Sequence, residues 1–319
     1  MKRFSVATSS IAAIFALTGA VMAEEHIPAS PFGPDDQAGA SNLITPEKVR
    51  DAAALITDGN IYPLARTFDG DMPLFGARAF ALRATGGLSG GPLGDNNVIW
   101  NDEFLATEIG QVGTQFDGLA HIGIRTPEGD RYYNNFTGEQ IHGPQGMAML
   151  GIEHVKPFFT RGVLVDLVAH KGEMLDAGYE VTVEDITGAL EAQGVDPDSI
   201  GEGEVVLIHT GWGSLWGEDN RRFNSGAPGI GMEAGRWLAE KRIAIVGSDT
   251  WPVEVVPNPN SSIAFPVHQE LIVRNGIYIY ENVATERLAD AEVYEFAFSF
   301  TPMPIRGATG APGNAMAIR

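Results

Sequence analysis

The sequence of 319 residues contains no cysteine. This absence excludes disulfide scaffolds, thiolate zinc sites, iron–sulfur clusters and cysteine nucleophiles as classes. Basic residues are also few, because 21 Lys and Arg stand against 41 Asp and Glu and the formal net charge is −20. A phosphate backbone or an anionic bilayer repels such a surface. We therefore expect neither nucleic-acid binding nor electrostatic docking to a membrane.

The chain also lacks a fixed-period repeat and a long polar linker. Hydrophobic residues make up 44% of the sequence and charged residues 19%, which is typical of a globular protein. We expect residues 24–319 to form a single domain that binds a small-molecule substrate.

The first 23 residues have the three parts of a secretory signal peptide. Lys2 and Arg3 form a positive start, Ile11–Val21 is largely apolar, and Val21-Met22-Ala23 is a small-residue cleavage site. We therefore expect a mature chain that begins at Glu24, lies in the periplasm or outside the cell, and has no membrane contact after processing.

The clearest secondary-structure pattern is strand, helix, strand. Glu204–His209 is a buried-strand run, Met232–Lys241 is amphipathic, and Ile243–Gly247 is a second apolar strand. This order predicts a βαβ unit with a parallel strand pair, and hence an α/β fold. Further elements are expected at Gly162–Val168 (strand), after the cap residue Thr182 (helix), and at Gly276–Tyr280 and Tyr294–Phe300 (strands).

Polar side chains recur in the glycine-punctuated run from Gly110 to His121. In an extended chain Gln111 and Gln115 lie on the same face but about 13 Å apart, too far to share one ion. A turn must therefore intervene, and Gly113 is placed to allow it. Asp117 and His121 complete the polar set.

Two more residues are candidates for the same site. His268 follows Pro266-Val267, and Glu281 stands at the end of the strand Gly276–Tyr280. Two acids and two imidazoles that converge are able to hold a divalent metal and supply a base. From these residues alone, a structural polar cluster is an equal alternative.

The run Gln111-Val112-Gly113-Thr114-Gln115-Phe116-Asp117-Gly118-Leu119-Ala120-His121 resembles the signature His-x-Gly-Thr-His-x-Asp-x-Pro-x-His. That signature belongs to the cyclase family of metal-dependent hydrolases, which includes bacterial kynurenine formamidase and isatin hydrolase. Other segments are similar to the family's longer members in the same order, among them Thr210-Gly211-Trp212, Val246-Gly247-Ser248-Asp249-Thr250 and Arg306-Gly307-Ala308-Thr309-Gly310-Ala311-Pro312. The resemblance implies a compact α/β swivelling domain with mixed sheets flanked by helices, and assembly as dimers or tetramers.

The resemblance also implies roles for individual residues. Asp117 matches a metal ligand, His121 matches the catalytic acid/base, and His268 and Glu281 match the downstream ligands. Gln111 and Gln115 stand where the family has two metal-binding histidines. The expected metal set is therefore Gln111, Gln115, Asp117, His268 and Glu281.

The two glutamines affect which metal ion the site is expected to prefer. An amide oxygen is a weaker zinc ligand than an imidazole, and the oxygen-rich set favours a harder ion such as Mn²⁺. Folding outside the cytoplasm favours Zn²⁺, which outcompetes Mn²⁺ at most sites. We take Zn²⁺ first and Mn²⁺ second.

The sequence is thus interpreted as a metal-dependent hydrolase of a small amide, cyclic amide or lactone, in which His121 is the acid/base. Phe116, Trp212 and Trp251 are expected to line the substrate pocket. Two alternatives stay open. One is a secreted binding protein that holds no metal, which the two glutamines favour, and the other is a metal-assisted lyase or dehydratase.

Overall fold

A single large sheet organises the molecule. The computed structural model of the protein describes residues 27–84 and 90–319. Nine strands pair in the order β1-β17-β15-β9-β11-β13-β14-β4-β16. The strands of this sheet are β1 (Ile61–Pro63), β4 (Gln115–Asp117), β9 (Phe158–Asp166), β11 (Val205–His209), β13 (Ile245–Ser248), β14 (Tyr278–Glu281), β15 (Glu295–Phe300), β16 (Gly310–Pro312) and β17 (Met316–Ile318).

The sheet is parallel in the centre and antiparallel toward both edges. β9, β11, β13 and β14 run parallel to one another. β15 pairs antiparallel with β9 on one side, and β4 pairs antiparallel with β14 on the other. β11 and β13 are buried at every residue, and β9 is buried at all but Phe159 and Arg161, as expected of parallel strands covered on both faces. The expected α/β fold with a mixed sheet is confirmed.

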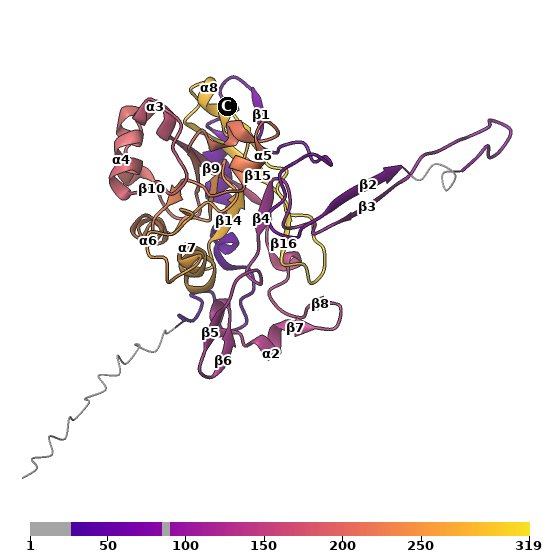
Figure 1. The fold of residues 1–319 in the computed structure, drawn as a ribbon, viewed down its shortest axis with the longest axis horizontal. Helices are drawn as coiled ribbons and strands as arrows, with labels where there is room; N and C mark the ends of the chain where they lie inside the picture. The colour runs from indigo at the N-terminus through magenta and orange to yellow at the C-terminus, as the bar shows by residue number, and fades with distance from the viewer. Residues whose placement is uncertain (1–26, 85–89) are drawn as a thin grey trace, which may run out of the picture.

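Helices α3, α4 and α6 gather beside the sheet (Figure 1). The α-helices are α1 (Pro46–Ala53), α2 (Gly138–Ile141), α3 (Leu167–Lys171), α4 (Val183–Ala192), α5 (Asn220–Phe223), α6 (Met232–Glu240), α7 (Pro266–His268) and α8 (Glu286–Asp290). Short 3₁₀ helices are η1 (Gly39–Leu43), η2 (Tyr133–Asn135), η3 (Ile152–His154), η4 (Pro197–Ser199) and η5 (Trp212–Leu215), and η6 (Gln269–Arg274) is a π-helix. None of the helices within the described ranges is long and apolar enough to cross a membrane.

The βαβ unit predicted from the sequence is present. β11 leads through α6 to β13, and the two strands pair in parallel from Val205 opposite Ile245 to Ile208 opposite Ser248. β9 differs most from the prediction, because it begins at Phe158 rather than at Gly162 and ends at Asp166 rather than at Val168. The Asp166 side chain accepts a hydrogen bond from the Ala169 backbone N–H and so starts α3 there.

Four small two-stranded sheets lie outside the main sheet: β2 (Phe80–Ala84) with β3 (Glu103–Thr107), β5 (Ile124–Thr126) with β6 (Gly129–Arg131), β7 (His142–Gly143) with β8 (Gly146–Met147), and β10 (Glu180–Val181) with β12 (Gly229–Ile230). The β2–β3 pair forms a long arm that projects from the body (Figure 1). The expected signal peptide, residues 1–23, lies outside the described residues.

Candidate metal centre

Three buried side chains meet at the end of β14. Asp117, His268 and Glu281 each offer one ligand atom, and these atoms all lie within 4.8 Å of one another. His268 Nε2 is 3.3 Å from Glu281 Oε1 and 3.8 Å from Asp117 Oδ2. Among the described residues no group donates a hydrogen bond to the buried Asp117 Oδ2. A buried carboxylate oxygen without a donor, facing a second acid and an imidazole, fits a divalent cation.

The pairing of β4 with β14 sets this geometry. Gln115 lies directly opposite Glu281, and Asp117 lies opposite Ile279. Side chains alternate along a strand, so Gln115 and Asp117 face the same side as Glu281 while Phe116 faces the other. The expected turn is also present, since Gly113 has a φ of +62° and brings Gln111 back beside Asp117.

Each glutamine donates to one of the acids. Gln111 Nε2 is 2.8 Å from Asp117 Oδ1, and Gln115 Nε2 is 2.5 Å from Glu281 Oε2. Gln111 Oε1 accepts from Arg78 Nη2 at 2.9 Å. A guanidinium only donates and a carboxylate only accepts, so the Gln111 amide has one orientation between them. Its oxygen is held by Arg78 and points away from the acids.

His268 is held from behind by a residue that the sequence analysis did not single out. Glu254 Oε1 is 2.5 Å from His268 Nδ1 and also accepts the His268 backbone N–H at 2.9 Å. Glu254 is 1% exposed. A carboxylate on the far nitrogen fixes the ring orientation and directs Nε2 at the cluster. Neither Glu254 nor Arg78 belongs to a sequence motif, so only their contacts reveal them.

Burial and mutual charge shift the pKa values of the cluster. Burial lowers the pKa of His268, but the carboxylates of Glu254 and Glu281 outweigh it and raise that pKa to about 10. Burial and the neighbouring Asp117 carboxylate raise the pKa of Glu281 to about 7. When no cation is bound, His268 and Glu281 therefore bind protons more tightly than the free side chains do.

His121 lies at the rim of the cluster and outside the set of three. Its Nε2 is 3.9 Å from Asp117 Oδ2, and its side chain is 21% exposed. Burial lowers the pKa of His121, Asp117 opposes this shift, and the cations of His268 and Arg78 reinforce it. The ring is therefore neutral at neutral pH and able to accept a proton.

A small cavity with a volume of about 10 Å³, room for about one water molecule, adjoins the cluster. The residues that line it include Gln115, Glu281, Phe75, Arg78 and Trp251. The rings of Phe75 and Trp251 stack with centroids 4.2 Å apart. Of the three aromatics expected to line a substrate pocket, Trp251 is thus next to the cluster.

The other two expected pocket residues are packed in hydrophobic clusters. Phe116 is fully buried and contacts the rings of Phe158, Tyr278 and Phe300. Trp212 is 1% exposed and donates its indole N–H to the Phe223 carbonyl oxygen.

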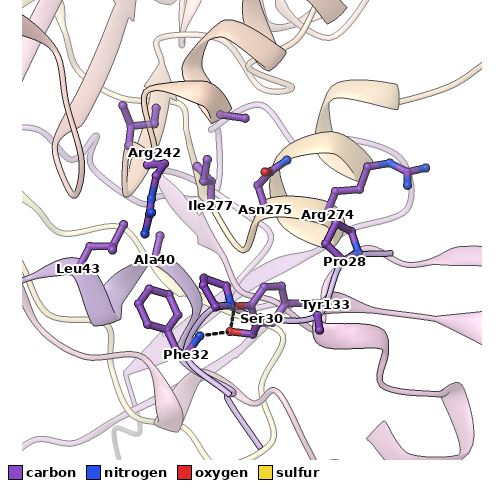
Figure 2. A pocket seen from close by; sticks show the side chains of 14 residues that line it. Pro28, Ser30, Phe32, Ala40, Leu43, Tyr133, Arg242, Arg274, Asn275 and Ile277 are labelled. Atoms are coloured by element: carbon purple, nitrogen blue, oxygen red, sulfur yellow. Dashed lines mark hydrogen bonds between the residues drawn. The ribbon is translucent and has the colours of Figure 1, made fainter. Parts of the chain in front are cut away.

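A second cavity, of about 250 Å³, lies away from the cluster. Figure 2 shows it between Phe32 and Tyr133 on one side and Arg242 and Ile277 on the other. Ile277 precedes β14 and Glu281 ends it, so about 13 Å of strand separates the two places. Arg242 pairs with Glu202 at 2.8 Å, which already neutralises that cation.

Comparisons with known proteins show what the chain is similar to. The family model Cyclase matches residues 62–255, which is more than half of the chain and includes the Gln111–His121 run. The chain belongs to the cyclase family. A solved structure described as a novel cyclase is 33% identical, covers 90% of this chain and 98% of its own, and superposes with a TM-score of 0.79. The family resemblance inferred from the sequence is confirmed.

More distant cyclase-family structures share the fold. Isatin hydrolase A from Labrenzia aggregata is 22% identical, covers 83% of this chain and 94% of its own, and has a TM-score of 0.60. Isatin hydrolase A from Ralstonia solanacearum is 18% identical, covers 86% of this chain and 98% of its own, and also has a TM-score of 0.60. No curated protein matches the sequence at a significant level.

Proposed function

We propose that this cyclase-family protein is a metal-dependent hydrolase of a small amide, cyclic amide or lactone. The observation that carries the proposal is the buried set of Asp117, His268 and Glu281, in which Asp117 Oδ2 has no donor among the described residues. Similarity to isatin hydrolases and to a predicted metal-dependent hydrolase supports the reaction class. The expected localisation, periplasmic or secreted, is proposed with it.

We assign one divalent cation to each chain, with Asp117, His268 and Glu281 as its protein ligands. Gln111 and Gln115 use their amide nitrogens to hold the second oxygens of the two acids. They therefore position ligands rather than add to them. Two carboxylates and one imidazole form a set that both Zn²⁺ and Mn²⁺ accept, with Zn²⁺ favoured by its higher intrinsic affinity. When bound, such an ion polarises a substrate carbonyl and lowers the pKa of water.

His121 is the proposed acid/base. It lies at the rim, its ring is neutral at neutral pH, and it reaches the cluster without belonging to it. In this position it accepts a proton from the attacking water and returns it to the leaving nitrogen or oxygen. The stacked rings of Phe75 and Trp251 are positioned to hold the apolar body of the substrate.

Two alternatives make different predictions. A binding protein without metal is consistent with the glutamine contacts, which already partner one oxygen of each acid. A metal-free binding protein gives no role to Asp117 Oδ2, which has no donor among the described residues. A lyase or dehydratase in which His121 removes a carbon-bound proton would incorporate solvent deuterium into a product without hydrolysis.

The test compares two variants for metal content and for turnover of isatin, an aryl formamide and an aryl lactone. His121→Ala should keep one ion per chain and lose about 10²–10⁴-fold in turnover, the usual contribution of an acid/base. Asp117→Ala should lose the ion and the activity together.

Circular dichroism of both variants must match that of the parent. Loss of the ion from His121→Ala would identify His121 as a ligand. A parent protein that holds no stoichiometric ion in metal-supplemented buffer would favour the binding protein.

A further inference from the structure

Asn282 carries a buried amide oxygen beside the metal centre. The residue follows Glu281 at the end of β14 and is 6% exposed. Within the described part of the chain, no group donates a hydrogen bond to Asn282 Oδ1. Buried acceptors in native proteins are nearly always paired, because an unpaired one costs free energy. The donor for this oxygen therefore has to come from outside the chain.

The orientation of this amide is fixed by its neighbours. Asn282 Nδ2 donates to the Gly113 carbonyl oxygen at 2.7 Å. A carbonyl only accepts, so the amide nitrogen has to lie on this side and the amide oxygen on the other. The backbone is held as well, because the Asn282 N–H donates to the Thr250 carbonyl oxygen at 2.9 Å and the Asn282 carbonyl oxygen accepts from Thr114 Oγ1 at 2.8 Å. Asn282 Oδ1 is thus held in place as an acceptor.

A left-handed backbone conformation brings Asn282 to the same cavity as Glu281. In a continuous strand, successive side chains point to opposite faces, so Asn282 would face away from Glu281. The φ of Asn282 is +57°, a conformation that asparagine adopts more readily than most residues. The turn ends the alternation, and both residues line the cavity of about 10 Å³. The acceptor therefore lies beside the candidate ligand.

The donors and acceptors of the cavity match an amide. Asn282 supplies an acceptor, and Arg78, which lines the same cavity, carries the donors of a guanidinium. An amide with an N–H offers both a donor and a carbonyl acceptor, whereas a lactone only accepts. We infer that Asn282 Oδ1 accepts the N–H of the substrate and so selects an amide or cyclic amide over a lactone of the same shape. This inference rests on the proposed hydrolase function and narrows its substrate class.

The apolar body of such a substrate has a place next to the cavity. The cavity itself has room only for the reacting group. The ring of Phe75 stacks on Trp251 with centroids 4.2 Å apart, and Phe75 is 38% exposed whereas Trp251 is 8% exposed. When the Phe75 side chain turns outward, a flat ring of the substrate takes its place on the buried indole.

The experiment compares ligands that differ at the N–H. Isothermal titration calorimetry in metal-supplemented buffer measures the binding of oxindole and of indan-2-one, in which a CH₂ replaces the N–H. The parent protein should bind oxindole roughly 10-fold or more tightly, because indan-2-one leaves Asn282 Oδ1 unpaired. Asn282→Gly should bind both with equal affinity and keep its bound ion, since glycine adopts the same left-handed backbone conformation. Its kcat/KM should fall about 10–100-fold for formanilide and stay unchanged for phenyl formate, which has no N–H.

Asn134→Gly is the matched control. Asn134 is also left-handed, with a φ of +56°, and is 9% exposed. Its Oδ1 already accepts the Ser30 backbone N–H at 2.8 Å, so it has no need of a ligand. Asn134→Gly therefore loses a buried amide in the same backbone conformation and should keep the preference of the parent for oxindole.

Three outcomes would overturn the inference. A parent that binds the two ligands equally, or binds neither, would mean that water alone serves Asn282 Oδ1, and this result does not depend on any variant. A preference for oxindole that survives in Asn282→Gly would assign the selection to another group. Loss of the ion from Asn282→Gly would make the oxygen a metal ligand. A preference that Asn282→Gly abolishes, in a protein that hydrolyses neither formanilide nor phenyl formate, would instead support the binding role of Asn282 and reject the hydrolase.

Discussion

Gln111 and Gln115 stand where the family signature has histidines, and their amide groups can donate hydrogen bonds to the acids of the site. A neutral imidazole offers one lone pair to a metal, whereas an amide also carries two donors that a carboxylate accepts. In this chain both amide nitrogens are turned to acids, and the Gln111 oxygen is taken by Arg78. In the proposed function, the two glutamines therefore hold the acids that bind the cation and do not bind it themselves.

The first prediction at this scale concerns pH and the metal-free protein. The pKa of Glu281 rises from 4.5 to about 7 on folding, and that of His268 from 6.5 to about 10. Both groups bind protons more tightly when folded, so their stabilising contributions are complete below the unfolded pKa and vanish as pH rises through the folded one. The Tm of chelator-treated protein should therefore fall as pH rises, through Glu281 between about pH 4.5 and 7 and through His268 between about pH 6.5 and 10.

The measurement is a set of thermal melts with and without metal. The metal-loaded protein should show a flatter profile, because the ion replaces the protons. Glu281→Gln should remove the part of the fall between about pH 4.5 and 7. A Tm of the metal-free protein that rises across this range would contradict the assigned pKa shifts.

The second prediction concerns Glu254 as a positioning residue. Glu254→Gln keeps the size of the side chain but removes the charge behind His268 Nδ1, so metal affinity should fall about 10–100-fold. Competition with a chelator measures the affinity. Glu202→Gln, an acid 48% exposed at the surface, is the control and should bind as tightly as the parent. Unchanged affinity in Glu254→Gln would show that the contact does not orient the ligand.

At the scale of elements, the site depends on strands that are held in one register. Asp117 reaches Glu281 and His268 only because β4 pairs with β14 so that Gln115 lies opposite Glu281. A shift of one residue would turn Asp117 into the core and Phe116 into the site. The buried packing of Phe116 against Tyr278 is therefore part of what places the acids.

The prediction at this scale concerns Gly162 in the middle of β9. Gly162 lies opposite Phe296 on β15, and an added Cβ would come within 2.2 Å of the buried Phe296 ring. Gly162→Ala should lower the free energy of unfolding by about 1–3 kcal/mol, because the packed ring has to move. Urea denaturation measures this. Gly201→Ala, where an added Cβ meets no atom within 4 Å, is the control, and equal stability of the two variants would refute the packing argument.

At the scale of the whole molecule, residues far apart in sequence form one site at one end of the parallel strands. The site draws on four segments, which hold the signature run, Glu254, His268 and Glu281, and Arg78 before β2 adds a fifth.

The prediction at this scale concerns processing. Cleavage after Ala23 should give a mature N-terminus at Glu24, since Val21-Met22-Ala23 supplies the small residues of a cleavage site. N-terminal sequencing of protein exported from a bacterial host tests it. Recovery of Met1 in the exported material would mean that residues 1–23 are not removed.

The sequence by itself predicted the fold class and the family, and it named Asp117, His268 and Glu281, which the structure brings together. Apolar runs and cap residues such as Thr182 are local, and the α4 capping box of Thr182 and Asp185 forms as the sequence predicts. The order of residues from Gln111 to His121 carries the family signature without any knowledge of the fold.

Only the tertiary structure decided which atoms of these residues face one another. The orientation of the Gln111 amide depends on Arg78, 33 positions earlier, and the orientation of His268 depends on Glu254, 14 positions earlier. The alternation of side chains along a strand determines which residues share a face. Long-range strand pairing decides which of the two faces lies in the core, and in β4 it is the face that carries Phe116. Hydrogen-bond partners across such separations leave no local pattern in a sequence, because any donor the fold brings near an acid can serve.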